Sequence, residues 1–256
     1  MKLFFRKEGT GKPLVILHGL FGLSDNWMSF AKTLGQQFSV YIPDLRNHGQ
    51  SPHSAVFDFS SLEDDLLEFL EDQHLHNIDL LGHSLGGKIS MLFALHHPEM
   101  VGKLIVVDIS LRKYPSGREH QQLIDAMLSI DFSIVKSRSE VDQQLIKRIP
   151  SAKLRQLLMK NIYWRNRGIL DWRLNLTSIN ENLPAIFEGV ETPGEYAGPS
   201  LFIRGGLSSY VSDSDLELIK KKFPGAEVVT FANASHWVHA DAPGEFQAIV
   251  RKFLEL

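Results

Sequence analysis

The chain has 256 residues, of which 43% are hydrophobic, and a formal net charge of −3 at pH 7, so one large α/β domain with a well-buried core fits better than two independent domains. That charge gives no electrostatic reason to expect nucleic acid as a partner, and the absence of cysteine excludes disulfides, thiolate nucleophiles and cysteine-based metal sites. No apolar run approaches transmembrane length and the first residues do not resemble a signal peptide, so we expect a cytoplasmic protein without stable membrane insertion.

The first core segment is residues 14–17, a wholly apolar run that ends at His18. A short run without polar residues predicts a strand buried on both faces, as in a parallel sheet. Gly19 and Gly22 in the following loop allow backbone N–H groups to turn toward a ligand, so this loop is a candidate oxyanion-binding element. A glycine turn with no further role is the alternative.

A second strand is expected at residues 40–42, and a polar loop over residues 43–51 follows it. Asp44 and His48 in this loop invite a catalytic assignment. A hydrogen-bonded turn that braces the neighbouring loops explains the same composition, and we favour that interpretation.

The segment that organises the chain is residues 78–89, where an apolar strand runs through Gly82-His83-Ser84-Leu85-Gly86 into a helix-favouring run. Strand, Gly-x-Ser-x-Gly and helix in this order are typical of a nucleophile elbow, a tight turn that exposes the serine hydroxyl. Side chains at the two glycine positions would clash across the turn. Ser84 is therefore the candidate nucleophile, and the N–H of Leu85 lies close to it.

The same stretch nearly matches a phosphate-binding P-loop, because Gly82 and Gly87-Lys88 have the required spacing. That pattern next requires Ser or Thr, whose hydroxyl binds magnesium, and this chain has Ile89. An alkyl group cannot replace a magnesium ligand, so nucleotide binding is disfavoured. A purely structural Gly-Ser-Gly turn stays open as the second alternative.

Asp108 is the first residue after another apolar strand, expected at residues 104–107. Ligands of open α/β sheets bind beyond the carboxyl ends of the strands, so Asp108 is well placed for a catalytic role. Over residues 111–198 polar helical segments succeed one another without strands, which predicts a helical cap inserted between core strands. We expect residues 1–110 and 199–256 to form the core.

A histidine-containing loop follows the last expected strand, residues 227–231. His236 in this loop completes the chain order Ser, Asp, His that accompanies the nucleophile elbow. His239, three residues later, is the rival base, although local hydrogen bonding is our interpretation of it.

Together these features resemble the α/β-hydrolases, and more narrowly the YbfF-type bacterial carboxylesterases and their mitochondrial relatives. The likeness spans nearly the whole chain and rests on residues 18–22, 44–49, 82–88, 107–109, 205–211 and 236–240. The resemblance implies a mostly parallel sheet flanked by helices, with a helical cap and with neither metal nor organic cofactor. It also implies Ser84 as nucleophile, His236 as base and the N–H groups of Leu20 and Leu85 as oxyanion hole, with Phe21 as the alternative second donor.

The position of the acid departs from the wider superfamily. Many α/β-hydrolases place it after the strand that matches residues 200–203, near Ser208, and a serine there supplies no carboxylate. In the YbfF-like branch the acid lies at the position that matches Asp108, which we therefore expect to be the acid. Asp213 and Asp215 are alternatives, although helix capping explains both.

The expected protein is a carboxylesterase-type serine hydrolase that acts on a small-molecule acyl ester or thioester, as a monomer or homodimer. A perhydrolase, a carbon–carbon bond hydrolase or a menaquinone-pathway lyase could use the same three residues. A non-catalytic ligand-binding member of the fold is the alternative from another functional class.

Overall fold

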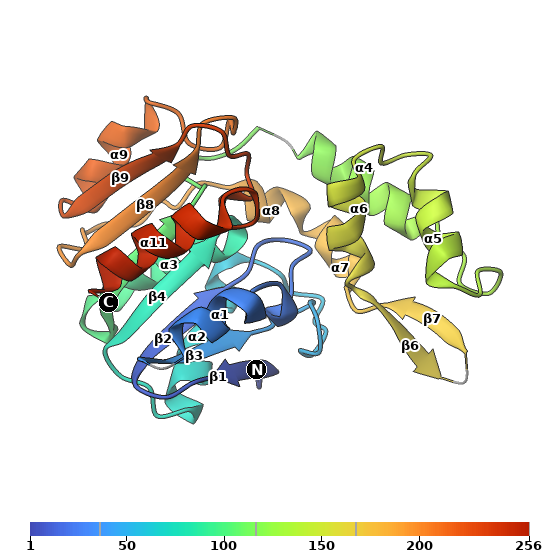
Figure 1. Cartoon of the computed structure of the whole chain (residues 1–256), viewed down its shortest axis with the longest axis horizontal. Coiled ribbons are helices and arrows are strands. Elements are labelled where there is room, and N and C mark those ends of the chain that lie inside the picture. The colour runs from blue at the N-terminus through green and yellow to red at the C-terminus, as the bar shows by residue number, and fades with distance from the viewer. Residues whose placement is uncertain (36, 116, 167, 256) are drawn as a thin grey trace.

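A seven-stranded sheet forms the centre of the molecule in the computed structural model, which describes residues 1–35, 37–115, 117–166 and 168–255 (Figure 1). In spatial order its strands are β1 (Phe5–Glu8), β3 (Phe38–Pro43), β2 (Lys12–Leu17), β4 (Ile78–His83), β5 (Val101–Val107), β8 (Ser200–Gly205) and β9 (Ala226–Phe231). Only β1 pairs antiparallel to its neighbour, and every other pair in the sheet is parallel. The predicted mostly parallel sheet is confirmed.

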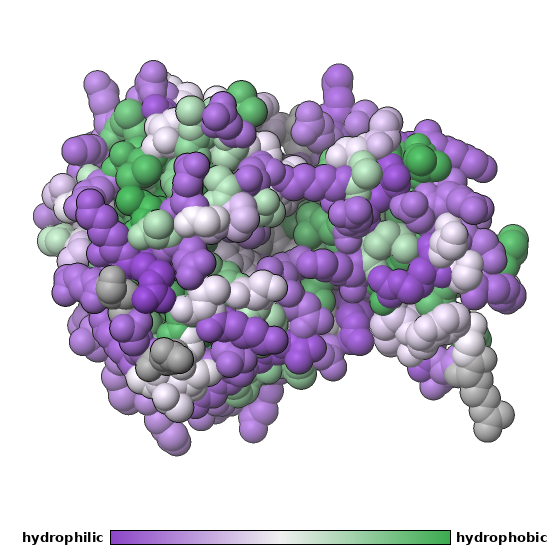
Figure 2. Space-filling model, in the orientation of Figure 1, coloured by the Kyte–Doolittle hydropathy of each residue, from purple (hydrophilic) through white to green (hydrophobic). Residues whose placement is uncertain are grey.

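Helices cover both faces of this sheet, because successive strand side chains point to opposite sides. In β2, Leu14 and Ile16 pack in the cluster that holds α1 (Met28–Leu34) and α11 (Pro243–Leu254). Val15 and Leu17 pack in the cluster that holds α2 (Phe59–Asp72), α3 (Leu85–His96) and α9 (Asp215–Lys222). Hydrophilic side chains predominate on the face seen in Figure 2, as expected when the apolar strand residues lie inside. Within the described ranges, no helix has the length and apolarity needed to cross a membrane.

An insertion between β5 and β8 lies beside the sheet, on the right in Figure 1. Its elements are α4 (Arg118–Leu128), α5 (Arg138–Leu145), α6 (Ala152–Met159), β6 (Ile162–Asn166), β7 (Ile169–Trp172), α7 (Leu176–Glu181) and α8 (Leu183–Phe187).

The expectation that this insertion has no strands is wrong, because β6 and β7 pair as an antiparallel hairpin. The physical reason is local: aromatic and branched side chains favour strands, and Gly168, with φ +91°, supplies the turn. The hairpin buries Leu170 and Trp172 toward the rest of the insertion.

Hydrogen bonds tie the insertion to loops at the carboxyl edge of the sheet. The backbone N–H of Asn175 donates to the carbonyl of Asn47 at 3.0 Å, and the Asn47 side-chain amide donates to the Ser178 hydroxyl at 3.2 Å. Further along the edge, the Asn161 amide donates to the Phe21 carbonyl at 2.7 Å. The insertion therefore contacts the glycine loop after β2 and the polar loop after β3, which both border the predicted site.

Candidate active site

Ser84 occupies the turn between β4 and α3, with φ 52° and ψ −117°. Such a conformation is strained for a residue with a side chain, and it persists only where the surroundings enforce it. The Ser84 N–H donates to the carbonyl of Val107 at 3.0 Å. A Cβ atom on Gly82 would lie 2.2 Å from the Gly86 carbonyl oxygen, and one on Gly86 would lie 2.3 Å from that of Leu17. The turn therefore requires glycine at both positions around the serine.

Gly86→Ala is expected to lower the free energy of unfolding by about 3 kcal/mol, because the new methyl group overlaps a backbone oxygen that cannot move alone. Gly244→Ala in α11 is the matched control, since a Cβ there meets nothing within 4 Å and alanine favours a helix by up to about 1 kcal/mol. Urea denaturation of both variants checks this. Equal unfolding free energies for the two variants would contradict the steric account of the turn.

Asp108 follows β5 with φ 50° and is buried. Its Oδ1 accepts the N–H of Gly205 at 2.8 Å, and its Oδ2 accepts the Ser208 hydroxyl. The same Oδ2 lies 2.8 Å from Nδ1 of His236. Because a carboxylate oxygen only accepts, His236 carries its proton on Nδ1, and Nε2 is left with a lone pair.

Two further contacts hold His236 in place. Its ring stacks on Tyr210 with centroids 4.0 Å apart, and its carbonyl accepts the Nε2–H of His83 at 2.9 Å. In the described part of the chain His236 hydrogen-bonds Asp108 and His83, and no hydrogen bond joins it to the Ser84 hydroxyl. Catalytic hydrogen bonds of this type often tighten only when substrate binds. The structure thus brings His236 into contact with Asp108, the residue after the Val107 carbonyl that Ser84 binds, while the catalytic roles of all three residues stay a prediction.

The alternative acids contact other partners. Asp213 pairs with Arg204 at 2.7 Å and is 86% exposed. Asp215 is buried and pairs with Arg112 at 3.1 Å. Neither carboxylate contacts His236, so Asp108 alone among these three candidates orients the imidazole.

The alternative base, His239, lies in an apolar environment. Its ring stacks on Trp27 at a centroid distance of 4.3 Å. Burial lowers the pKa of His239 to about 3, and no carboxylate among the described residues contacts its ring nitrogens. The expected local hydrogen bond is also missing, since Nδ1 of His239 is buried without a partner in those residues.

The backbone N–H groups near Ser84 differ in what they bind. The Phe21 N–H donates to Nε2 of His48 at 3.2 Å, and burial lowers the pKa of His48 to about 3, which keeps that nitrogen an acceptor. By contrast, the Leu20 N–H has no partner among the described residues, and Leu85 begins α3, where N–H groups lack helical acceptors. Leu20, Ser84 and Leu85 all line one small hollow of about 20 Å³.

A comparison with known families matches residues 12–148 to the alpha/beta hydrolase fold. The chain belongs to this family. It is 38% identical over 257 residues to the sn-1-specific diacylglycerol lipase ABHD11 of Danio rerio, covering 98% of this chain and 81% of that protein. It is 29% identical to the esterase YbfF of Escherichia coli strain K12, over 97% of this chain and 95% of that one. The solved structure of a marine microorganism esterase is 43% identical, with a TM-score of 0.95 over 98% of this chain and 99% of that one.

In this α/β-hydrolase the polar loop after β3 holds the neighbouring loops in place through hydrogen bonds. Asp44 accepts the N–H of Ser24 at 2.6 Å and the N–H of Gln50 at 2.8 Å. His48 bonds Phe21 through one ring nitrogen and the Arg46 carbonyl through the other, at 2.9 Å. Both side chains are fully engaged in loop structure, which agrees with our interpretation of the sequence.

Sequence reasoning missed two side chains of the candidate site. Ser208 bonds the carboxylate that orients His236, and Tyr210 covers the imidazole face. A signal existed for Ser208, since it occupies the position where many relatives carry the acid and so must lie near the histidine. Tyr210 had no signal of this type, because stacking depends on loop geometry.

Proposed function

We propose that the protein is a serine hydrolase that cleaves carboxylic esters, and acyl thioesters, through an acyl-enzyme on Ser84. The observation that carries this proposal is the 2.8 Å contact between His236 Nδ1 and Asp108 Oδ2, at the end of the strand whose last carbonyl, that of Val107, accepts the N–H of the strained Ser84. Named relatives that are esterases or lipases support it.

In the first half-reaction the Ser84 oxygen attacks the ester carbonyl carbon while Nε2 of His236 takes the hydroxyl proton. Asp108 stabilises the imidazolium that results. The N–H groups of Leu20 and Leu85 are proposed as the oxyanion hole, each contributing about 3–4 kcal/mol to the transition state. His236 then donates its proton to the leaving oxygen, the carbon–oxygen bond breaks, and the alcohol departs.

In the second half-reaction water attacks the acyl carbon, with His236 again as base. The tetrahedral intermediate collapses, the Ser84 oxygen regains a proton from His236, and the carboxylic acid leaves. No residue changes its net protonation over the cycle, and no cofactor is required.

Residues 111–198 are proposed to act as a cap over a core made of residues 1–110 and 199–256. The support is that Tyr114, Ile186 and Phe187 from this insertion line the hollow that contains Ser84. Cap side chains would then set acyl specificity. A cytoplasmic location stays a prediction from the sequence.

A panel of p-nitrophenyl esters and acyl-CoA thioesters of rising chain length tests the proposed function, with a β-diketone to probe carbon–carbon cleavage. We expect ester turnover with kcat on the order of 1 to 10³ s⁻¹ and no cleavage of the β-diketone. Cleavage of the β-diketone without ester turnover would favour a carbon–carbon bond hydrolase instead.

A further inference from the structure

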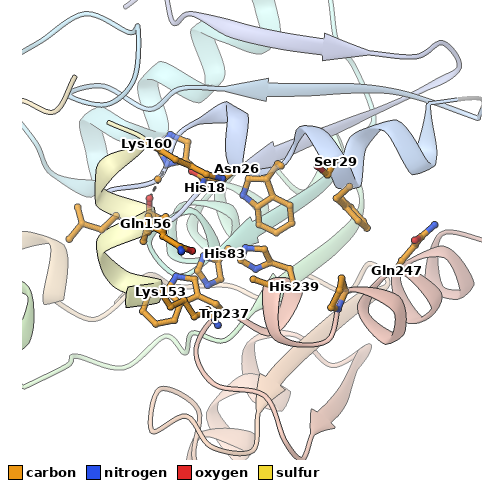
Figure 3. A pocket seen from close by; sticks show the side chains of 18 of the residues that line it. His18, Asn26, Ser29, His83, Lys153, Gln156, Lys160, Trp237, His239 and Gln247 are labelled. Carbon is orange, nitrogen blue, oxygen red and sulfur yellow. Dashed lines mark hydrogen bonds between the residues drawn. The ribbon is translucent and has the colours of Figure 1, made fainter. Parts of the chain in front are cut away.

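A cavity of about 370 Å³ lies beside the hollow that contains Ser84 and does not include that residue (Figure 3). In Figure 3, α6 and α1 stand on opposite sides of it, and α10 (Val238–Asp241) carries His239 into its wall. The apolar and aromatic part of the wall includes Trp27, Phe30, Leu157 and Trp237. A concave, largely apolar site of this size is typical of a small-molecule subsite.

The buried part of this cavity wall is uncharged, and its charged side chains are exposed to solvent. His83 and His239 both line it, and burial lowers the pKa of His83 well below its usual value and that of His239 to about 3. Lys153 and Lys160 line the cavity as well, but the charge of Lys153 is paired with Asp241, and Lys160 is an exposed residue at the C-terminal end of α6. An uncharged apolar group therefore suits the interior.

The cavity and the hollow that contains Ser84 are separated only by the loop that carries Gly19 and Leu20. Leu20 lines both the cavity and the hollow that contains Ser84. Gly19 also lines the cavity, and a Cβ built on it would lie 3.2 Å from Cβ of Ser84 and 2.9 Å from Nδ1 of His83. A group that passes over Gly19 from Ser84 therefore enters the cavity directly.

The chemistry indicates which half of the ester enters. The leaving oxygen must accept a proton from His236, so the leaving group lies on the side of that imidazole. His83, whose ring centroid lies 4.8 Å from that of His236, and Trp237, the next residue in the chain, both line the cavity on that side. We propose that this cavity is the leaving-group subsite and that it selects esters of flat, apolar alcohols about the size of two fused rings. This inference rests on the proposed function.

Three esters distinguish the alcohol half of the substrate from the acyl half. Ethyl acetate has no ring system, 2-naphthylmethyl acetate carries it on the alcohol side, and ethyl 2-naphthylacetate carries it on the acyl side. Burial of the ring system in the cavity is expected to raise kcat/KM for 2-naphthylmethyl acetate about 10- to 100-fold above that of ethyl acetate. Ethyl 2-naphthylacetate, which carries the same rings on the acyl side, is expected to gain less than about threefold over ethyl acetate.

Two variants that fill the cavity from opposite walls test the assignment: Ser29→Trp on α1 and Gln156→Trp on α6. Each is expected to lower the ratio of kcat/KM for 2-naphthylmethyl acetate over ethyl acetate by about tenfold. Gln143→Trp on α5 makes the same change at an exposed position outside the cavity wall and should leave this ratio unchanged. Thermal unfolding midpoints establish that all three variants are folded.

The inference is overturned if the filling variants lower the rates of both acetates equally, or if they act only on ethyl 2-naphthylacetate, which would place the acyl half in the cavity. Either result leaves the proposed function intact as long as Ser84→Ala abolishes turnover of all three esters. Turnover that survives Ser84→Ala would instead remove the proposed function itself.

Discussion

Ser84→Ala is expected to lower kcat for ester hydrolysis by about 10⁴- to 10⁶-fold. The methyl group cannot attack the carbonyl carbon, and the hydroxyl of Ser208, which lies at the same pair of residues, donates to the Asp108 carboxylate. Initial rates with p-nitrophenyl acetate, corrected for the spontaneous reaction, measure the effect.

Ser60→Ala serves as the matched control, because Ser60 is an exposed serine in α2, away from the hollow that contains Ser84. This variant should retain wild-type kcat and KM. If the Ser84→Ala enzyme keeps more than a few per cent of wild-type activity, Ser84 is not the nucleophile.

Asp108→Asn is expected to lower kcat by about 10⁴-fold with little change in overall structure. The asparagine amide would present either an N–H or a neutral oxygen to Nδ1 of His236. With the N–H facing it, Nδ1 must accept, so the proton moves to Nε2 and the base is lost. The pH dependence of kcat/KM, measured beside the wild type, reports the change in the imidazole.

Asp213→Asn and Asp215→Asn are the controls for this prediction. Asp213 is exposed and paired with Arg204, while Asp215 is paired with Arg112, so neither change reaches His236. Both variants should retain activity within about threefold of the wild type. An Asp108→Asn enzyme with nearly full activity, beside an inactive Asp215→Asn enzyme, would move the acid to residue 215.

The parts of the site that sequence predicts well depend on short-range patterns. Gly82 and Gly86 around Ser84 are required by a local clash, and Asp108 follows directly from the end of an apolar strand. The same reasoning predicts the parallel sheet, because buried central strands read as continuous apolar runs.

The parts that sequence does not predict depend on contacts between distant residues. The choice between Leu20 and Phe21 as oxyanion donor depends on His48, because a ring nitrogen of His48 already accepts the Phe21 N–H. The stacking of Tyr210 on His236 likewise depends on how two loops meet. The hairpin of β6 and β7 was missed for another reason. The polar segments on both sides of it favour a helix, whereas burial of alternate residues against the rest of the protein stabilises strands there.

Covalent labelling by an alkyl fluorophosphonate, with the modified residue located by peptide mass spectrometry, tests most directly whether Ser84, Asp108 and His236 work as one unit. We predict that the label attaches to Ser84 alone and that the rate of labelling falls at least about 10³-fold in His236→Ala, because the serine then lacks its base. A label on another serine, or an equal rate of labelling with and without the imidazole, would contradict this account.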